Sequence, residues 1–384
     1  MQKSGGSVDG GVVKPKMNFE FYMKEVTELK KILKYSCLVI VFGMLLGMLY
    51  ACKKENTTPD DSVDSVTEQP VDSGQENENN DNNQSSDQNN EGGEDTPTDK
   101  PDEDGYYVTE KYIDATLLSF NIKMAYNETQ RVEAVGKSLA AQNASVICLQ
   151  EVWESNVVTL QTALADSHEV IYKSLQSGRA EGLAIAYDKT QWRLVSENRF
   201  WLSETPEVKS KSWGAESYAI CYNVVLEHID SGVKLHVFNT KLDEVSETAR
   251  NGGIQLVMSE IEKSPYPVFF GCDLNAVNTS EAYKIATKKL TDAQKTEGAD
   301  TGVTYHKDRT TTDGLSSDFC LVSGDRITTD SFNICRDKYG ENNDLFLSDH
   351  YAIKAKVKIS YTVTGRPDAT DDGFDGALDA VGQA

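Results

Sequence analysis

The chain has 384 residues, with 61 acidic and 38 basic side chains and a formal net charge of −23. Its 39% hydrophobic residues suffice for one large globular domain or two smaller ones. The negative charge argues against a protein that grips nucleic acid through a broad basic surface. It stays compatible with a nuclease whose phosphate contacts are made through a metal.

The first segment of the chain is basic and contains an apolar run. Residues 1–54 carry a net charge of +5, and residues 37–51 are continuously apolar. A basic segment before a short apolar run predicts a secretory signal peptide, because the run is too short for a comfortable membrane span. The run ends in Leu-Tyr-Ala-Cys, which resembles the lipobox of bacterial lipoproteins. We therefore expect a signal peptide over 1–52 with a lipidated Cys52; an uncleaved helical anchor is the alternative.

These features also predict a location and a tether. The mature protein is expected in the bacterial cell envelope, held to a membrane by its lipid and facing the periplasm or the cell surface. Residues 55–104 hold 17 acidic side chains and one lysine, with runs of Asn, Gln and Ser. Such a composition cannot bury a core, so residues 53–105 are predicted to be a disordered acidic linker. A partner-binding segment is the alternative, and the small acidic tail 364–384 is also expected to be disordered.

Residues 106–363 alternate between strand-like and helix-like patterns. Apolar residues at helical spacing predict helices around 132–139 and 254–261. A further helix, capped by Ser155, is expected through Leu164, and another is expected at 279–290. Strand-type runs with hairpins between some of them predict an α/β (α+β) layered sandwich with mixed sheets. The runs are 115–122, 145–150, 170–175, 182–187, 218–229, 233–240, 267–272, 318–323 and 350–363.

Polar residues stand where several of these strands begin or end. In layered α/β folds strand ends converge on a shared rim where ligands bind. Carboxylates and amides suit magnesium, manganese or calcium, and one imidazole beside them suggests a base acting on water. Each such residue alone is more often a turn or cap residue, but the repetition predicts a hydrolytic metal site. The residues are Asn121, Glu151, Asp273, Asn275, Asp318, Asp349 and His350.

Motifs in a fixed order make the chain similar to a known family. It resembles the endonuclease/exonuclease/phosphatase superfamily of metal-dependent phosphoesterases over about 240 residues. FWLSETPE and the Trp-Gly that follows point to its secreted bacterial branch. The resemblance implies a four-layered sandwich, two mixed β-sheets flanked by helices. The matching segments include LLSFNIK (117–123), VICLQEVWE (146–154), FNTKLDEVSETAR (238–250), FFGCDLNA (269–276), SDFCLVS (317–323) and LSDHYAI (347–353).

The resemblance implies a role for each matching residue at the metal and at the base. Glu151 would be the principal metal ligand, Asp349 would complete the metal site, and Asn121 would support it. His350 would be the general base. Asp318 would bond to its other ring nitrogen and fix its tautomer and basicity.

The remaining matching residues would act on the substrate. Asp273 and Asn275 would hold the attacking water or protonate the leaving oxygen, and would bind a phosphate oxygen. Glu181 and Asn239 would contribute to substrate binding. Lys241 stands where relatives carry the histidine that contacts the scissile phosphate. Lysine can donate to a phosphate oxygen, but it cannot shuttle a proton as readily at neutral pH.

The implied protein is a lipid-anchored, exported, metal-dependent phosphoesterase. It would use a divalent metal, Mg²⁺ ahead of Mn²⁺ or Ca²⁺, and act as a monomer. Its substrate would be a nucleic acid, a phosphorylated small molecule or a phospholipid head group. The competing hypothesis is a non-catalytic surface binding protein that retains the fold, because Lys241 and Ala219 depart from the family at substrate-contacting positions.

Overall fold

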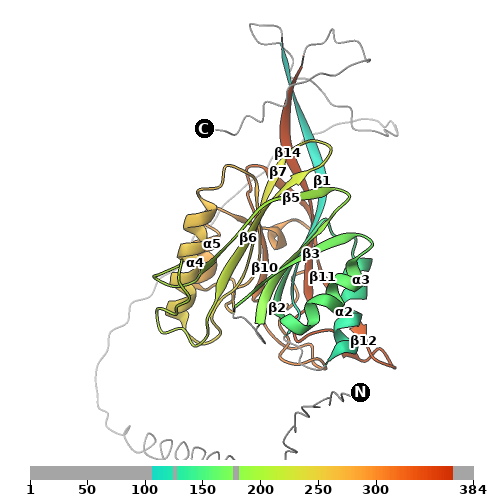
Figure 1. The fold of residues 1–384 in the computed structure, drawn as a ribbon, viewed down its shortest axis with the longest axis vertical. Coiled ribbons are helices and arrows are strands. Elements are labelled where there is room, and N and C mark those ends of the chain that lie inside the picture. Colours follow the sequence, from blue (N-terminus) through green and yellow to red (C-terminus); the bar gives the residue numbers. More distant parts are fainter. Residues whose placement is uncertain (1–105, 124–127, 176–180, 366–384) are drawn as a thin grey trace, which may run out of the picture. The chain divides into compact units, whose positions relative to one another are not determined.

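The structure, a computed structural model, describes residues 106–123, 128–175 and 181–365 (Figure 1). The predicted signal peptide, Cys52 and the linker 53–105 lie outside the described residues. Within the described part, no helix has the length and apolar character needed to cross a membrane. Its strands form two six-stranded mixed sheets, with helices on the outer side of each, which confirms the predicted sandwich.

The first sheet has the strand order β11-β14-β1-β2-β4-β3. Its only parallel pair in the described residues is β1 with β2, and all its other neighbours are antiparallel. The strands are β1 (Tyr107–Asn121), β2 (Val146–Trp153), β3 (His168–Ser174), β4 (Glu181–Asp188), β11 (Ile327–Cys335) and β14 (Ala352–Gly365).

The second sheet has the order β5-β6-β7-β8-β10-β9, and β7 pairs with β8 in parallel. The short strands β12 (Lys338–Tyr339) and β13 (Leu345–Phe346) pair separately. The strands of the second sheet are β5 (Trp192–Trp201), β6 (Ile220–His228), β7 (Lys234–Lys241), β8 (Val268–Asp273), β9 (Thr291–Asp292) and β10 (Asp318–Val322).

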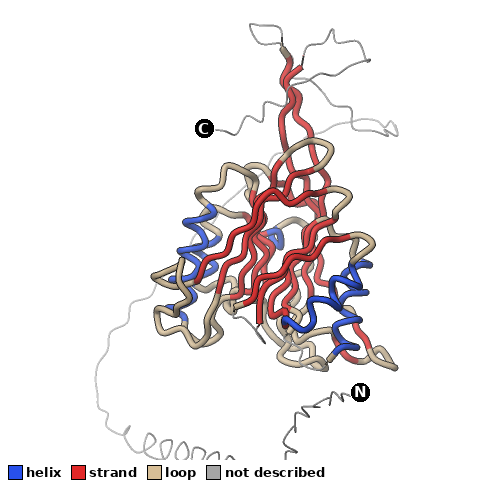
Figure 2. Tube along the Cα trace, in the orientation of Figure 1, coloured by secondary structure: helices blue, strands red, loops and turns tan. Residues whose placement is uncertain are grey.

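Two pairs of helices form the outer layers, one on each side of the strands (Figure 2). Helices α2 (Thr129–Ala141) and α3 (Val157–Leu164) pack on the first sheet, and α4 (Glu247–Ile261) and α5 (Glu281–Ala286) pack on the second. The single-turn 3₁₀ segments η1 (Glu154–Asn156) and η2 (Ala293–Lys295) precede α3 and follow β9.

Alternation along the strands explains why their central stretches are mostly apolar. Leu117 of β1 packs into the core between the sheets, whereas its neighbour Leu118 packs against the α2 and α3 layer. In β2 the same alternation separates Cys148 from Ile147. Because successive side chains point to opposite faces and both faces are covered, most positions in the middle of these strands are apolar, and the buried polar residues Ser119 and Gln150 hydrogen-bond to each other.

Some predicted boundaries differ from the structure. β1 begins eight residues earlier than expected, at Tyr107, and runs antiparallel to β14 from the pair Tyr107–Gly365 onward. Residues 107–112 and 360–365 pair only with each other among the described strands and extend beyond the sheet as a two-stranded ribbon (Figure 1). Their mixed exposure leaves no apolar run to detect. β14 itself includes two residues that were predicted for the tail.

Strands β5 and β11 were not predicted, and three predicted elements are shorter in the structure. Asp349 and His350 precede β14 instead of opening it, because the strand begins at Ala352. α3 begins at Val157, and its N-cap is Asn156 instead of the predicted Ser155; α5 ends at Ala286. The predicted helical faces around 132–139 and 254–261 are confirmed, since their apolar residues are buried against the sheets.

Arg131 of α2 fixes the two loops that carry site residues. Its side chain is 2% exposed, and Nη1 donates to the carbonyl oxygens of Ile122 at 2.6 Å and Leu347 at 2.7 Å. Nη2 donates to the carbonyl of Lys123 at 2.6 Å, and Nε pairs with Glu128 at 2.5 Å. The guanidinium therefore ties the end of β1 to the loop before β14.

A close approach of the two sheets at Gly271 gives the first prediction. A Cβ on Gly271 of β8 would lie 2.7 Å from Cβ of Cys148 on β2. Gly271→Ala should therefore lower the free energy of unfolding by roughly 1–3 kcal/mol through overpacking. Urea unfolding measures this. Gly253→Ala is the control, since its Cβ would meet the flexible tip of Leu202 at 3.3 Å. Equal midpoints for the two variants would show that the sheets can separate at no cost.

The second prediction concerns the buried guanidinium. Arg131→Met leaves three carbonyl oxygens without their donor, so the free energy of unfolding should fall by about 3 kcal/mol. Arg326→Met is the matched control, because Arg326 is exposed and donates to one carbonyl, that of Pro265. Its effect should stay below about 0.5 kcal/mol. A similar small loss for Arg131→Met in chemical denaturation would contradict the proposed tie.

Candidate active site

Three site residues are neighbours across adjacent strands of the second sheet. Lys241 ends β7, Asp273 ends β8 and Asp318 begins β10. The strand register pairs Lys241 with Asp273 and Asp273 with Asp318. One ammonium and two carboxylates therefore lie in a row across the ends of three neighbouring strands of this sheet.

The first sheet contributes residues from the ends of β1 and β2. Asn121 is fully buried, and its Nδ2 donates to Glu151 Oε1 at 3.0 Å and to Asp273 Oδ2 at 2.9 Å. Glu151 has a positive φ of 53° and lies where the register of β2 against β4 shifts between Leu149 and Val152. A bulge of this kind re-aims a side chain, and here Glu151 meets Asn121 and Lys241. The two sheets are thereby joined through one amide.

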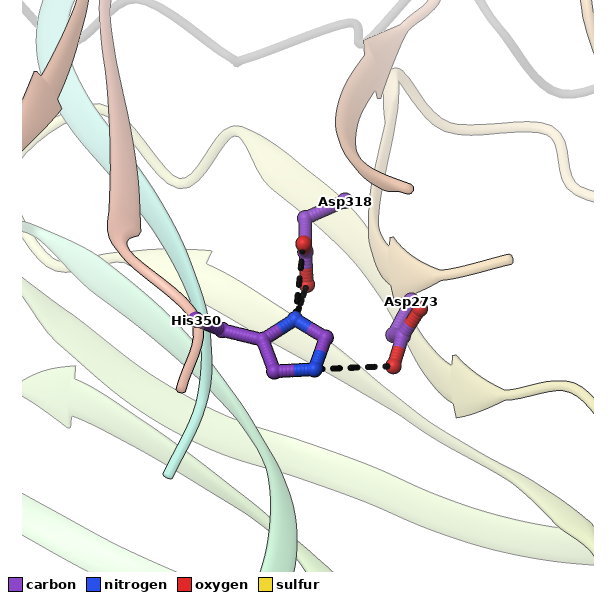
Figure 3. Close-up of side chains that lie close together, drawn as sticks. All are labelled: Asp273, Asp318 and His350. Carbon is purple, nitrogen blue, oxygen red and sulfur yellow. Dashed lines mark hydrogen bonds and ion pairs between the residues drawn. The ribbon is translucent and has the colours of Figure 1, made fainter. Parts of the chain in front are cut away.

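His350 lies between two carboxylates (Figure 3). Its Nδ1 lies 2.9 Å from Asp318 Oδ2, and its Nε2 lies 4.0 Å from Asp273 Oδ2. Thr304 donates its hydroxyl to Asp318 at 2.7 Å, and the Tyr305 ring packs on the imidazole with centroids 4.7 Å apart. All of these groups fix the ring orientation, so that Nδ1–H points to Asp318 and Nε2 faces the centre of the site.

Two lysines pair with the carboxylates of the site. Lys241 Nζ lies 2.9 Å from Glu151, 2.5 Å from Glu244 and 3.9 Å from Glu181. Lys123 Nζ lies 2.6 Å from Asp349. Glu244 and Lys123 were not predicted as site residues. Lys123 lies inside a family-like motif, but the sequence holds no sign that its side chain turns toward a residue 226 positions away.

These charges shift the acidity of their neighbours. Burial raises the pKa of Glu151, but Lys241 and the Asn121 amide lower it, to about 2 overall. Burial raises the pKa of Glu181 to about 7, although Lys241 opposes the shift. Burial, followed by the neighbouring Asp318, raises the pKa of Asp273. Burial lowers the pKa of His350, but Asp318 and Asp273 raise it above its usual value.

A small pocket adjoins Lys241. Glu181, Asp243, Glu244 and Lys241 line it together with Tyr218 and apolar residues of β4 and β6. Ala219 lines it as well. The pocket places carboxylates around the ammonium, so a bound group would meet hydrogen-bond acceptors at its rim.

Two predicted residues have backbone partners instead. Asn275 has a positive φ of 47°, and its Nδ2 donates to the carbonyl of Leu242 at 2.8 Å. Its backbone N–H donates to Asp273 Oδ1 at 2.9 Å, so it orients that carboxylate. Asn239 is fully buried and donates to the carbonyls of Leu149 and Ala184 across the two sheets. We therefore assign Asn239 to sheet packing and leave it out of the substrate-binding residues.

The donor set fits a hard divalent cation. Glu151 and Asp349 offer carboxylate oxygens, and both belong to one set of contacts around Asn121: Ser348 bonds to the Asn121 carbonyl and to Asp349. Carboxylate and amide groups are the ligands that magnesium, manganese and calcium prefer. Ligand atoms of Asp273, Asp318 and His350 also lie within 4.8 Å of one another, but His350 and Asp318 already bond to each other.

Comparison with known proteins gives a family match and a set of structural neighbours. The sequence model of the Endonuclease/Exonuclease/phosphatase family matches residues 118–350. Among curated proteins, none matches the chain. Many solved structures have a similar fold, and three of them are described below.

The first is an endonuclease/exonuclease/phosphatase family protein from Bacteroides thetaiotaomicron, with a TM-score of 0.59 and 22% identity over 65% of this chain and 99% of that chain. The second is a mannosyl-6-phosphatase from the same organism, with a TM-score of 0.58 and 22% identity over 63% of this chain and 99% of that one. The third is D. rerio TDP2 complexed with single-strand DNA product, with a TM-score of 0.52 and 16% identity over 64% and 98%.

At these identities the three likenesses show a shared fold. The family match carries more, because it spans more than half of the chain and contains all the strand-end residues described above, from Asn121 to His350. The chain belongs to the endonuclease/exonuclease/phosphatase family, whose members are hydrolytic phosphoesterases that use divalent metals.

Proposed function

We propose that the chain hydrolyses a phosphate ester by metal-assisted, in-line attack of water, with His350 as the general base. The observation that carries this proposal is the buried His350–Asp318 pair, which faces Asp273 beside the Glu151–Asn121 contact. A base oriented by a carboxylate, next to hard oxygen ligands, is what hydrolysis of a phosphate ester requires.

Glu151 and Asp349 would hold the cation, with Asn121 beside them. A divalent ion at this place would neutralise the phosphate and stabilise the charge that develops during displacement. Magnesium suits the carboxylate donors best, with manganese or calcium as alternatives. A positive charge there would also oppose the carboxylates that raise the pKa of His350, and so favour the neutral imidazole that a base must be.

The remaining residues would position the reactants. Asp318 holds the Nδ1–H tautomer, so Nε2 can take a proton from water. Asp273, oriented by Asn121 and by the Asn275 N–H, would hold the attacking water or protonate the leaving oxygen. Lys241 would donate to a phosphate oxygen in place of the histidine of relatives, as a positive charge without proton exchange.

The surroundings of Lys241 favour a compact substrate. Residues 105–384 carry a net charge of −12, and Glu181, Asp243 and Glu244 line the adjoining pocket. A nucleic acid would bring further phosphates toward these carboxylates, which costs affinity. A phosphorylated small molecule with hydroxyl groups would instead find hydrogen-bond acceptors. One structural neighbour is by name a mannosyl-6-phosphatase, which agrees with this choice.

A panel of phosphate esters tests the proposal. We expect hydrolysis that chelation abolishes and magnesium or manganese restores. Glu151→Gln should raise the metal concentration needed by roughly ten- to hundredfold, through loss of an anionic ligand. His350→Ala should lower kcat by roughly a hundred- to ten-thousandfold, through loss of the base. The panel should hold mannose 6-phosphate, p-nitrophenyl phosphate, bis-p-nitrophenyl phosphate, plasmid DNA, RNA and sphingomyelin.

Matched variants control for general damage. Glu260 lies on α4, and His228 lies at the end of β6 opposite to the end of β7 that carries Lys241. Glu260→Gln and His228→Ala should therefore keep full activity. Hydrolysis that continues in excess chelator would end the metal hypothesis. A wild-type protein inert on every ester, with and without each metal, would favour the non-catalytic binding protein instead.

We also propose that the protein is exported and anchored by a lipid on Cys52. The support is the basic segment, the apolar run 37–51 and the lipobox-like end of that run. A lipid-anchored phosphoesterase would act within the cell envelope on esters that reach it there.

The anchoring is tested by fractionation and mass spectrometry. Cys52→Ser should remove the lipid and release the protein from the membrane fraction, whereas Cys37→Ser should leave it bound. Peptides from residues 1–51 on the mature, membrane-bound protein would show that no cleavage occurs before Cys52, and the lipoprotein proposal would be wrong.

A further inference from the structure

Each carboxylate proposed to hold the metal is paired with a lysine. Lys241 Nζ lies 2.9 Å from Glu151 Oε1, and Lys123 Nζ lies 2.6 Å from Asp349 Oδ2. The two lysines come from different sheets, at the ends of β7 and just beyond β1. An ammonium on each ligand carboxylate means that a divalent cation meets competition at both of its anionic donors.

We propose that Lys123 and Lys241 compete with the divalent cation for Asp349 and Glu151 and, once displaced, bind the phosphate group of the substrate. The inference rests on the proposed metal site and adds an order to its use. Metal binding would release two ammonium groups, and these would then be available to phosphate oxygens.

Lys241 can break its ion pair with Glu151 and still remain in the site. Its side chain is only 12% exposed, and Glu244 and Glu181 lie 2.5 Å and 3.9 Å from Nζ. Three carboxylates thus share one ammonium. If a cation neutralises Glu151, the other two still hold Lys241 beside the site, within reach of a bound phosphate.

Lys123 can move for a different reason. Its backbone is fixed, because its N–H donates to Asn121 Oδ1 at 3.0 Å and its carbonyl accepts from Arg131 at 2.6 Å. Its side chain is 44% exposed and turns on four single bonds. Displacement of Nζ from Asp349 therefore needs side-chain rotation alone.

This arrangement has a thermodynamic signature. A lysine that competes for the ligand carboxylates weakens metal binding, and a lysine ammonium released from its carboxylate strengthens phosphate binding. Each lysine should therefore lower the affinity for the metal and raise the affinity for phosphate. If they only held the acidic cluster together, their removal would weaken binding of both.

Calorimetric titrations separate these alternatives. Mn²⁺ is titrated into the full-length protein, and inorganic phosphate is then titrated at saturating Mn²⁺. The variants are Lys241→Met, Lys123→Met and the double variant. Lys263→Met is the matched control, because Lys263 is exposed and pairs with Glu260 at 2.6 Å near the C-terminal end of α4. Glu151→Gln reports the metal site itself, and circular dichroism confirms that each variant folds.

We expect each lysine variant to bind Mn²⁺ roughly tenfold more tightly, the factor of one hydrogen-bonded ion pair, and phosphate more weakly by a similar factor. Lys263→Met should change neither. Should Lys241→Met fail to fold, the exposed Lys123→Met variant still decides the outcome.

Two results would overturn the inference. If Glu151→Gln weakens Mn²⁺ binding while the lysine variants leave it unchanged or weaken it too, the metal site stands and the competition does not exist. If neither the wild type nor any variant binds Mn²⁺, the proposed metal site fails together with the inference that depends on it.

Discussion

Repulsion among carboxylates crowded at the strand ends is the constraint on which the site depends. Asp273 and Asp318 are almost fully buried on neighbouring strands, and Glu151 joins them from the other sheet. Buried like charges are tolerated only when cations and N–H donors lie among them. Here Lys241, the His350 imidazole and the Asn121 amide take these places. The same groups that keep the carboxylates together are therefore the ones available for chemistry.

The sequence predicts which residues end strands, but it does not predict which strands become neighbours. Asp273 and Asp318 are 45 positions apart and come together because β10 pairs with β8, a pairing that no local pattern encodes. The family resemblance implied that both residues act in one site, but it did not give the order of the strands. The backbone turn at Glu151 depends on a bulge against β4, so only the paired strands reveal it.

Residues that act through long-range contacts were harder to predict. Arg131 resembles an ordinary surface arginine of an amphipathic helix, yet its side chain is buried on three carbonyl oxygens. Asn239 is the converse case. Its motif predicted a role in substrate binding, whereas its side-chain amide donates to the carbonyl oxygens of Leu149 and Ala184 in the interior. A polar side chain in a motif can serve the packing of the sheets as well as the reaction, and only its partners distinguish the two.

The ribbon formed by β1 and β14 has a practical consequence for handling this protein. The register pairs Tyr107 with Gly365, so both ends of the folded part leave from the tip of the ribbon. Asn121 lies at the other end of β1, and a strand of this length spans about 45 Å at about 3.3 Å per residue. A fluorophore or a resin attached at residue 107 or residue 365 itself would thus sit far from Asn121 and from the strand-end residues around it.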